Sequence, residues 1–161
     1  MCRLVPAILV KTAFEEAWRV AILANPEWLK WWRMGSNSFW IPEVKACDWT
    51  GAQRVAIRGN RIVGWLSLSV DRESQAVTQV SAVSLIEGDI GFLRAVDRWM
   101  TAARSEYRSI RWTCCVGNPA AKGWLKWAKA NGGGELCVIQ DQAMVDGVST
   151  AAHFFQVPGR Q

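Results

Sequence analysis

The chain has 161 residues, half of them hydrophobic and 20% charged, which is typical of one folded domain and excludes a disordered chain. Its apolar runs are far shorter than the roughly 20 residues of a membrane-spanning helix, so we expect no membrane span. The formal net charge is +5, but the lysines and arginines are dispersed, so the charge alone does not indicate a nucleic-acid-binding protein.

The first 51 residues predict one strand, two helices and a long loop. Residues 3–10 are apolar and contain Pro6, which confines a strand to a sheet edge or a bulge. An apolar stripe with helical spacing follows and predicts an amphipathic helix. Residues 27–34 predict a second, short helix. Residues 36–51 have no clean period and predict a long loop, a feature that is often functional in compact domains.

The segment from about residue 26 to residue 51 is rich in tryptophan, and we interpret it as an insertion in the domain. Five of the chain's 11 tryptophans lie there: Trp28, Trp31, Trp32, Trp40 and Trp49. Such a group indicates either a second small core or an exposed apolar surface. Because tryptophan is enriched at interface hot spots, the segment also predicts a protein partner or self-association.

The middle of the chain predicts a β-meander followed by a helix. A period of two over residues 53–58 and 62–70, with Gly59-Asn60 between them, predicts a hairpin with a two-residue turn. A third strand is predicted over residues 76–86. Apolar residues at helical spacing from Phe92 onward then predict an amphipathic helix.

Residues 109–134 carry the clearest pattern. An apolar run ends at Gly117, and Asn118 then has the chemistry of a helix N-cap, with Pro119 at the first helical position. An apolar stripe predicts an amphipathic helix that ends at Asn131 and the three following glycines. Two further strands are predicted over residues 135–145 and 151–157.

This order, β-α-α-β-β-β-α-β-α-β-β, predicts a single α+β domain over residues 1–161. We expect a mixed, mostly antiparallel sheet of six to seven strands flanked by about four helices. The strands before and after the helix that begins near Phe92 are expected to be parallel, joined by a right-handed crossover.

The order of elements, together with the run from Val116 to Ala121 around Asn118, resembles the GCN5-related N-acetyltransferase (GNAT) superfamily. The chain looks like a divergent member of it. The resemblance implies transfer of an acetyl group from acetyl-CoA to an amine, with no metal. It places the cofactor at the loop after the third meander strand and at the helix after Gly117. The cofactor-binding residues implied are Leu85, Ile86, Gly88, Asp89, Ile90, Gly91, Asn118 and Lys122.

Two positions depart from the family's pattern. The two glycines of the predicted pyrophosphate loop are three residues apart, and Glu87 and Asp89 add negative charge beside it. Leu125 occupies the place where the family has a general-acid tyrosine. The resemblance implies Glu87 as the catalytic base, and the alternative is that Glu87 and Asp89 only cap a helix.

The cysteines and the single histidine predict no further chemistry. Five cysteines occur without a CxxC motif, and His153 completes no set at zinc-ligand spacing. Cys114 and Cys115 point to opposite faces of a strand, and no histidine is close to them in the sequence, so we do not expect nucleophiles. His153 itself is expected to be a packed strand residue. Reduced cysteines indicate a cytoplasmic protein.

Two other functions remain open at this stage. The first is a catalytically inactive domain of the same fold, serving as a structural or protein-binding module, for example in a bacteriophage particle or in host interaction. The second is nucleic-acid binding through Arg54, Arg58 and Arg61, which is disfavoured because these charges are not clustered along a groove.

Overall fold

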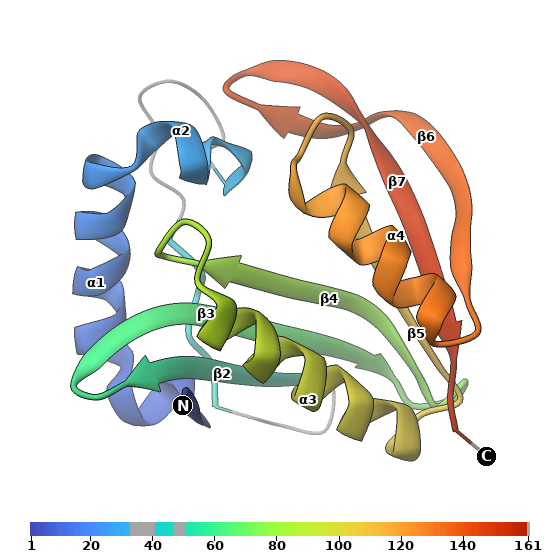
Figure 1. Ribbon diagram of the computed structural model, residues 1–161, viewed down its shortest axis with the longest axis horizontal. Helices are drawn as coiled ribbons and strands as arrows, with labels where there is room; N and C mark the ends of the chain where they lie inside the picture. The colour runs from blue at the N-terminus through green and yellow to red at the C-terminus, as the bar shows by residue number, and fades with distance from the viewer. Residues whose placement is uncertain (33–40, 47–50, 161) are drawn as a thin grey trace.

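The computed structural model describes residues 1–32, 41–46 and 51–160. One seven-stranded sheet runs through the protein in the order β1-β2-β3-β4-β5-β7-β6 (Figure 1). Neighbouring strands are antiparallel except β4 and β5, which are parallel. The strands are β1 (Arg3–Pro6), β2 (Gly51–Arg58), β3 (Arg61–Asp71), β4 (Ala76–Ser84), β5 (Ser109–Cys115), β6 (Gly134–Val145) and β7 (Val148–Pro158). The α-helices are α1 (Lys11–Ala24), α2 (Pro26–Leu29), α3 (Ile90–Glu106) and α4 (Ala120–Ala130), and the 3-10 turns are η1 (Ala7–Val10) and η2 (Lys30–Trp32).

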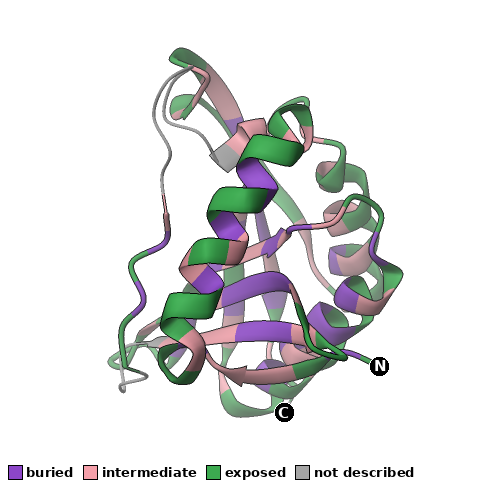
Figure 2. Ribbon diagram, turned by 90° about the vertical axis from the view of Figure 1, so that its left-hand side faces the viewer, coloured by how far each residue is buried: buried purple, intermediate pink, exposed green. Residues whose placement is uncertain are grey.

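Helices cover both faces of the sheet, and each face has its own core. On one face, Phe14 and Trp18 of α1 are fully buried in a cluster that includes Trp65 of β3. On the other face, Phe92 of α3 and Trp112 of β5 belong to a second buried cluster, against which α4 packs. Figure 2 shows the buried residues along the strands and on the inward sides of the helices. The amphipathic stripes of the sequence therefore face the sheet.

The start of α3 is fixed by a close approach between a ring and a strand. A Cβ on Gly64 of β3 would overlap the side chain of Phe92, so only glycine leaves room for that ring. Phe92 lies in the first turn of α3 and is 2% exposed. Gly64 therefore sets where the N-terminus of α3 sits relative to the sheet.

Strands β4 and β5 separate soon after they meet. They pair only at Ala76↔Ser109 and Val77↔Ile110, and then diverge, as Figure 1 shows. The next link between them is made by side chains, where Gln79 Nε2 donates to Thr113 Oγ1 at 3.3 Å. The divergence leaves two strand edges facing each other across a gap, with backbone groups that have no ladder partner across it.

The predicted order of elements and the parallel β4–β5 pair are confirmed, while several boundaries differ. Strand β4 ends at Ser84 and not at residue 86, β7 begins at Val148 and not at residue 151, and the predicted helix over 27–34 is a single α-helical turn followed by a 3-10 turn. The first strand ends at Pro6, because Ala7–Val10 turns into a 3-10 helix. Helix α4 begins one residue later than predicted, with Pro119 as its N-cap position. Asn118 still serves the helix, since its Oδ1 accepts a hydrogen bond from the Ala120 N–H at 2.9 Å.

Most of the predicted loop over residues 36–51 lies outside the described residues, as do Trp40 and Trp49. Residues 41–46 are described and have no regular secondary structure. None of the described helices is long and apolar enough to cross a membrane.

Candidate active site

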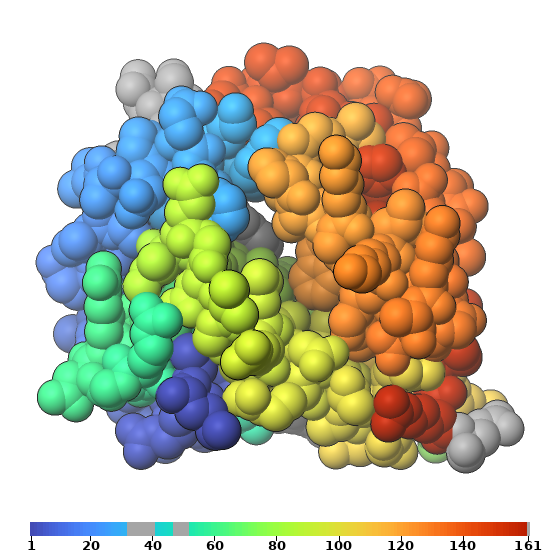
Figure 3. Space-filling model, in the orientation of Figure 1, coloured from blue at the N-terminus to red at the C-terminus, as the bar shows by residue number. Residues whose placement is uncertain are grey.

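The divergence of β4 and β5 opens a cavity of about 270 Å³. Its walls are β4 from Gln79 to Ser84, the end of β5, the start of α4, and residues of α2, η2, β6 and β7. Figure 3 shows this face of the molecule hollowed between α3 and α4. A cavity between two unpaired strand edges can accept an extended ligand that hydrogen-bonds to the backbone as a strand would.

Among the described residues, none of the side chains that line the cavity is charged. The polar ones are Gln79, Ser81, Ser84, Thr113, Cys114, Cys115, Asn118 and Gln142, together with tryptophan indoles. Burial raises the pKa of the Cys114 thiol to about 12, and the neighbouring Cys115 adds to this shift. Burial also raises the pKa of Cys115. Both thiols are therefore neutral near pH 7, and the cavity suits an uncharged ligand group.

Trp112 forms part of the cavity wall and is 1% exposed. Its ring is held by Trp124, Trp127 and Phe155, whose ring centroids lie 5.4, 5.7 and 5.5 Å away. Its indole Nε1 is buried and has no hydrogen-bond partner among the described residues. A buried donor without an acceptor costs about 1–3 kcal/mol, so the Trp112 N–H is an unsatisfied donor in a residue of the cavity wall.

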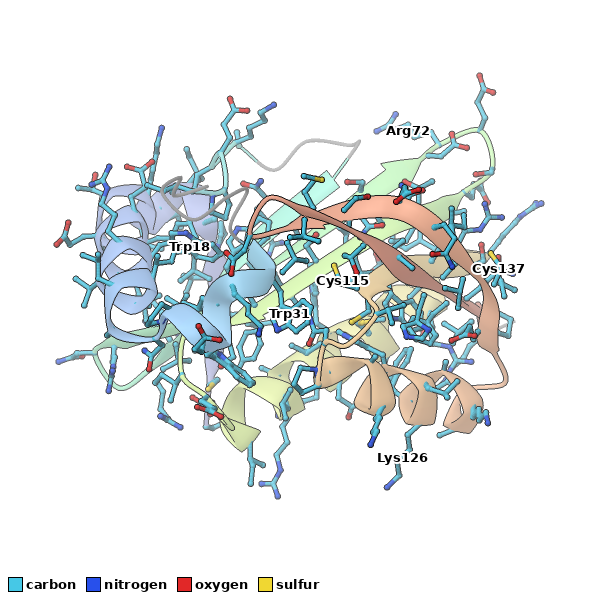
Figure 4. All side chains as sticks on the ribbon, turned by 90° about the horizontal axis from the view of Figure 1, so that it is seen from above. Trp18, Trp31, Arg72, Cys115, Lys126 and Cys137 are labelled. Atoms are coloured by element: carbon cyan, nitrogen blue, oxygen red, sulfur yellow. The ribbon has the colours of Figure 1, made fainter. Side chains whose placement is uncertain are left out.

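Two tryptophans of the predicted insertion close one side of the cavity. Trp28 donates from Nε1 to the carbonyl of Ser84 at 2.9 Å, which ties α2 to the end of β4. Trp31 lies near Cys115 at the centre of the molecule, as Figure 4 shows. Gly117 has a φ of +86°, and a Cβ added there would lie 3.5 Å from the Trp31 ring. The turn after β5 therefore favours glycine for its backbone and packs against Trp31.

The side chain of Trp32 lies outside the described residues, like Trp40 and Trp49. A partner or self-association through the five tryptophans stays a prediction. Trp28 and Trp31 additionally line the cavity, although they lie far from β4 and β5 along the chain.

The loop between β4 and α3, where the resemblance places cofactor-binding backbone, is largely occupied by its own contacts. The Leu85 N–H donates to the carbonyl of Val63 at 2.9 Å and is not free for a thioester. The Ile86 N–H faces Ser84 Oγ at 3.3 Å. Gly88 is exposed, with a φ of +67°, and Ile90 is also exposed.

Asp89 is the N-cap of α3, which confirms for this residue the alternative that it caps a helix. Its Oδ1 accepts from the Phe92 N–H at 3.0 Å and pairs with Arg58 Nη1 at 3.0 Å. Glu87, the implied base, is exposed and is not among the residues that line the cavity. Lys122 is exposed on α4, and Lys126, one turn further along, points outward in Figure 4.

His153 lies directly across the β5–β7 ladder from Cys114, a closeness that the sequence distance between them conceals. Its Nδ1 lies 2.6 Å from Glu135 Oε2, and its ring stacks on Phe155 at 5.8 Å. The histidine therefore joins β7 to β6 as a packed strand residue. Cys114 remains a protonated thiol because its pKa is raised, so the pair does not form an activated nucleophile. Within the described ranges, no three metal-ligating side chains are grouped.

Comparison with solved structures now identifies the architecture. RimJ of Mycobacterium smegmatis, in complex with CoA-disulfide, matches with a TM-score of 0.73 at 15% identity, covering 98% of this chain and 81% of that one. The ribosomal-protein α-N-acetyltransferase RimL, in complex with CoA, matches with a TM-score of 0.70 at 13% identity, covering 98% and 93%. The fold is that of the GNAT acetyltransferases.

A third GNAT structure is the spermidine N-acetyltransferase of Vibrio cholerae in complex with CoA and spermine. It matches with a TM-score of 0.69 at 12% identity, covering 98% of this chain and 95% of that one. The sequence itself matches no protein-family model and no characterised protein significantly. At these identities the GNAT likeness establishes the fold, and function has to be argued from the site.

Proposed function

We propose that the protein is a divergent acyltransferase that transfers an acetyl group from the thioester of acetyl-CoA to an amine. The observation that carries this proposal is the uncharged cavity between the diverging edges of β4 and β5. In the RimL structure the thiol end of CoA is joined to a cysteine by a disulfide. Here too the cavity holds cysteine thiols, Cys114 and Cys115, beside the place we assign to the thioester.

The residues present fit the pantetheine arm of such a donor. The arm is extended and contains two amide groups, which match the unpaired strand edges that form two walls of the cavity. A volume of about 270 Å³ is slightly below the roughly 300–1,000 Å³ of small-molecule pockets, so it suits an acyl arm and not a whole nucleotide cofactor. When bound, the donor supplies an activated acetyl group.

The chain's own residues hold the acyl arm, shield the thioester from water and polarise its carbonyl group. The indole N–H of Trp112 is a fixed donor for a carbonyl oxygen in the cavity, since the surrounding rings prevent it from turning away. Preorganised donors of this kind are the usual source of rate enhancement in acyl transfer. Trp28 and Trp31 restrict the access of water from the side of α2 and η2. Burial keeps Cys114 neutral, so it does not repel electron density that develops on sulfur.

Calorimetric titration with acetyl-CoA and with CoA tests the proposal. We expect saturable binding of one acetyl-CoA per chain, followed by mass-spectrometric detection of acetylated product when a panel of amines is added. An absence of binding at millimolar acetyl-CoA would overturn the proposal. It would favour the interpretation of a non-catalytic protein-binding domain on the same fold.

Trp112→Phe tests the role of the indole donor. The variant keeps an aromatic ring but removes the N–H, and we expect acetyl-CoA to bind about 5- to 10-fold more weakly, the equivalent of one lost hydrogen bond. Trp127→Phe is the matched control, because it makes the same change in a ring that packs against Trp112 but does not line the cavity. Equal losses in both variants would show that ring packing, and not the Trp112 N–H, supports binding.

A further inference from the structure

We infer that the protein recognises its acyl donor through the acyl-pantetheine arm and not through the diphosphate of CoA. The inference rests on the proposed function and narrows its substrate class to acyl-pantetheine thioesters in general. It comes from the start of α3, where the resemblance to GNAT proteins places the diphosphate and where the structure has a buried carboxylate, Asp89.

Asp89 already fills the N-terminus of α3. Its side chain is 0% exposed and caps the helix through the Phe92 N–H, at 3.0 Å. A helix N-terminus attracts negative charge because its first N–H groups have no partner within the helix. The carboxylate of Asp89 accepts from one of these N–H groups and supplies a negative charge from within the chain, so a second anion gains less there.

The second carboxylate oxygen of Asp89 is a further reason why a diphosphate does not fit here. Asp89 Oδ2 is buried and has no hydrogen-bond partner among the described residues. It is an acceptor, and only a group that donates a hydrogen bond would satisfy it. A diphosphate is ionised near pH 7 and offers only acceptor oxygens, so it would oppose this atom electrostatically. Glu87, exposed two residues earlier, adds a further negative charge.

The nearby Arg58 and Gly91 both serve the contacts of Asp89. Arg58 pairs with Asp89 at 3.0 Å, so its charge is already balanced. A Cβ on Gly91 would lie 3.1 Å from Asp89 Oδ1 and 3.6 Å from Arg58 Nη1. Glycine at this position therefore makes room for the ion pair. Gly88, the other glycine of this loop, has a φ of +67°, so neither glycine needs a phosphate to explain it.

Two cations that could balance a phosphate charge, one on α3 and one on α4, are exposed. Arg94 lies on the first turns of α3 and Lys122 on α4, and both side chains face solvent. Exposed ion pairs contribute little, because water and salt screen them. The cavity, by contrast, presents uncharged walls to an uncharged acyl arm. Recognition is therefore concentrated on the arm.

The test compares the affinities of acetyl-CoA and S-acetyl-pantetheine by calorimetry on the full chain. We expect dissociation constants within about 3-fold of each other, because the nucleotide adds little favourable contact. Acetyl-CoA binding more than about 10-fold tighter would overturn the inference and leave the acetyltransferase proposal standing. Binding of neither ligand at millimolar concentration would overturn both.

Asp89→Asn tests whether the negative charge of Asp89 is the reason that the diphosphate adds little affinity. Asparagine is also a good N-cap, so the helix start is kept while the negative charge is removed and Arg58 is released from its pair. We expect acetyl-CoA to bind about 5- to 10-fold more tightly and S-acetyl-pantetheine to bind as in the wild type. Asp89→Ser, also a capping residue, repeats the test if the asparagine variant folds poorly.

Glu106→Gln is the matched control for net charge. It removes one negative charge from the same helix, but at its exposed C-terminal end, about 25 Å away along 17 residues. We expect it to leave both affinities unchanged. An equal gain in acetyl-CoA affinity for Glu106→Gln and Asp89→Asn would show a general charge effect and overturn the assignment to Asp89.

Discussion

The helices that follow the two diverging strands, α3 after β4 and α4 after β5, begin in opposite ways. Helix α3 begins with a charged, fully buried cap, Asp89, which is paired with Arg58. Helix α4 begins after Asn118, a neutral amide that accepts one N–H and lines the cavity. The difference separates two roles within one fold. The start of α3 is closed on itself and stabilises the structure, whereas the start of α4 stays uncharged and belongs to the wall of the site.

The sharpest way to break the closed start of α3 is Asp89→Ala. This change removes the cap, leaves the Phe92 N–H without its acceptor and unpairs Arg58, so we expect a loss of about 2 kcal/mol in the free energy of unfolding. Urea unfolding at pH 7, with an unchanged m-value, measures it. A loss below about 0.5 kcal/mol would show that the cap and ion pair stabilise little.

Burial keeps the thiol of Cys114, in the wall of the cavity, neutral. The free energy of unfolding should therefore depend on pH. The pKa of Cys114 is raised from 9.0 to about 12, so the folded chain holds this proton when the unfolded chain has released it. The contribution of Cys114 is complete below about pH 9 and is lost as the pH rises from 9 toward 12. At pH 10 the loss amounts to about 1.4 kcal/mol.

Comparison of unfolding free energies at pH 7 and pH 10 measures this effect. The wild type should lose about 1.4 kcal/mol more than Cys114→Ala between these pH values. Cys137→Ala removes an exposed thiol from the edge strand β6 and should follow the wild type. If Cys114→Ala loses as much as the wild type, the thiol of Cys114 is not held neutral by burial.

Local patterns predicted most of the fold, because each element carries its own period. The stripes of α1, α3 and α4 and the alternation of β2 and β3 are visible in short windows of sequence, and so is the turn at Gly59-Asn60, where Gly59 has a φ of +60°. The capping role of Asp89 was also readable, since an acid directly before an apolar helical stripe has few other uses.

The site was harder to predict, because its walls come from distant parts of the chain. Trp31 and Cys115 line the same cavity only because η2 packs near the turn that follows β5. Neither the register of Cys114 with His153 nor the missing partner of the Trp112 N–H has a local signature. Sequence patterns report which face of an element is buried, but they do not report which buried donor lacks an acceptor.

The smallest effect concerns the neutral start of α4. Asn118→Ala removes the acceptor for the Ala120 N–H at a solvent-accessible helix start, and we expect a loss of about 0.5–1 kcal/mol, less than for Asp89→Ala. Asn118→Asp should restore the stability, since a carboxylate also accepts this bond and is favoured by the helix dipole. It would also make the two helix starts alike in charge. If the neutral wall matters for the ligand, Asn118→Asp will therefore weaken acetyl-CoA binding although it stabilises the fold, and a titration alongside the unfolding curves separates the two effects.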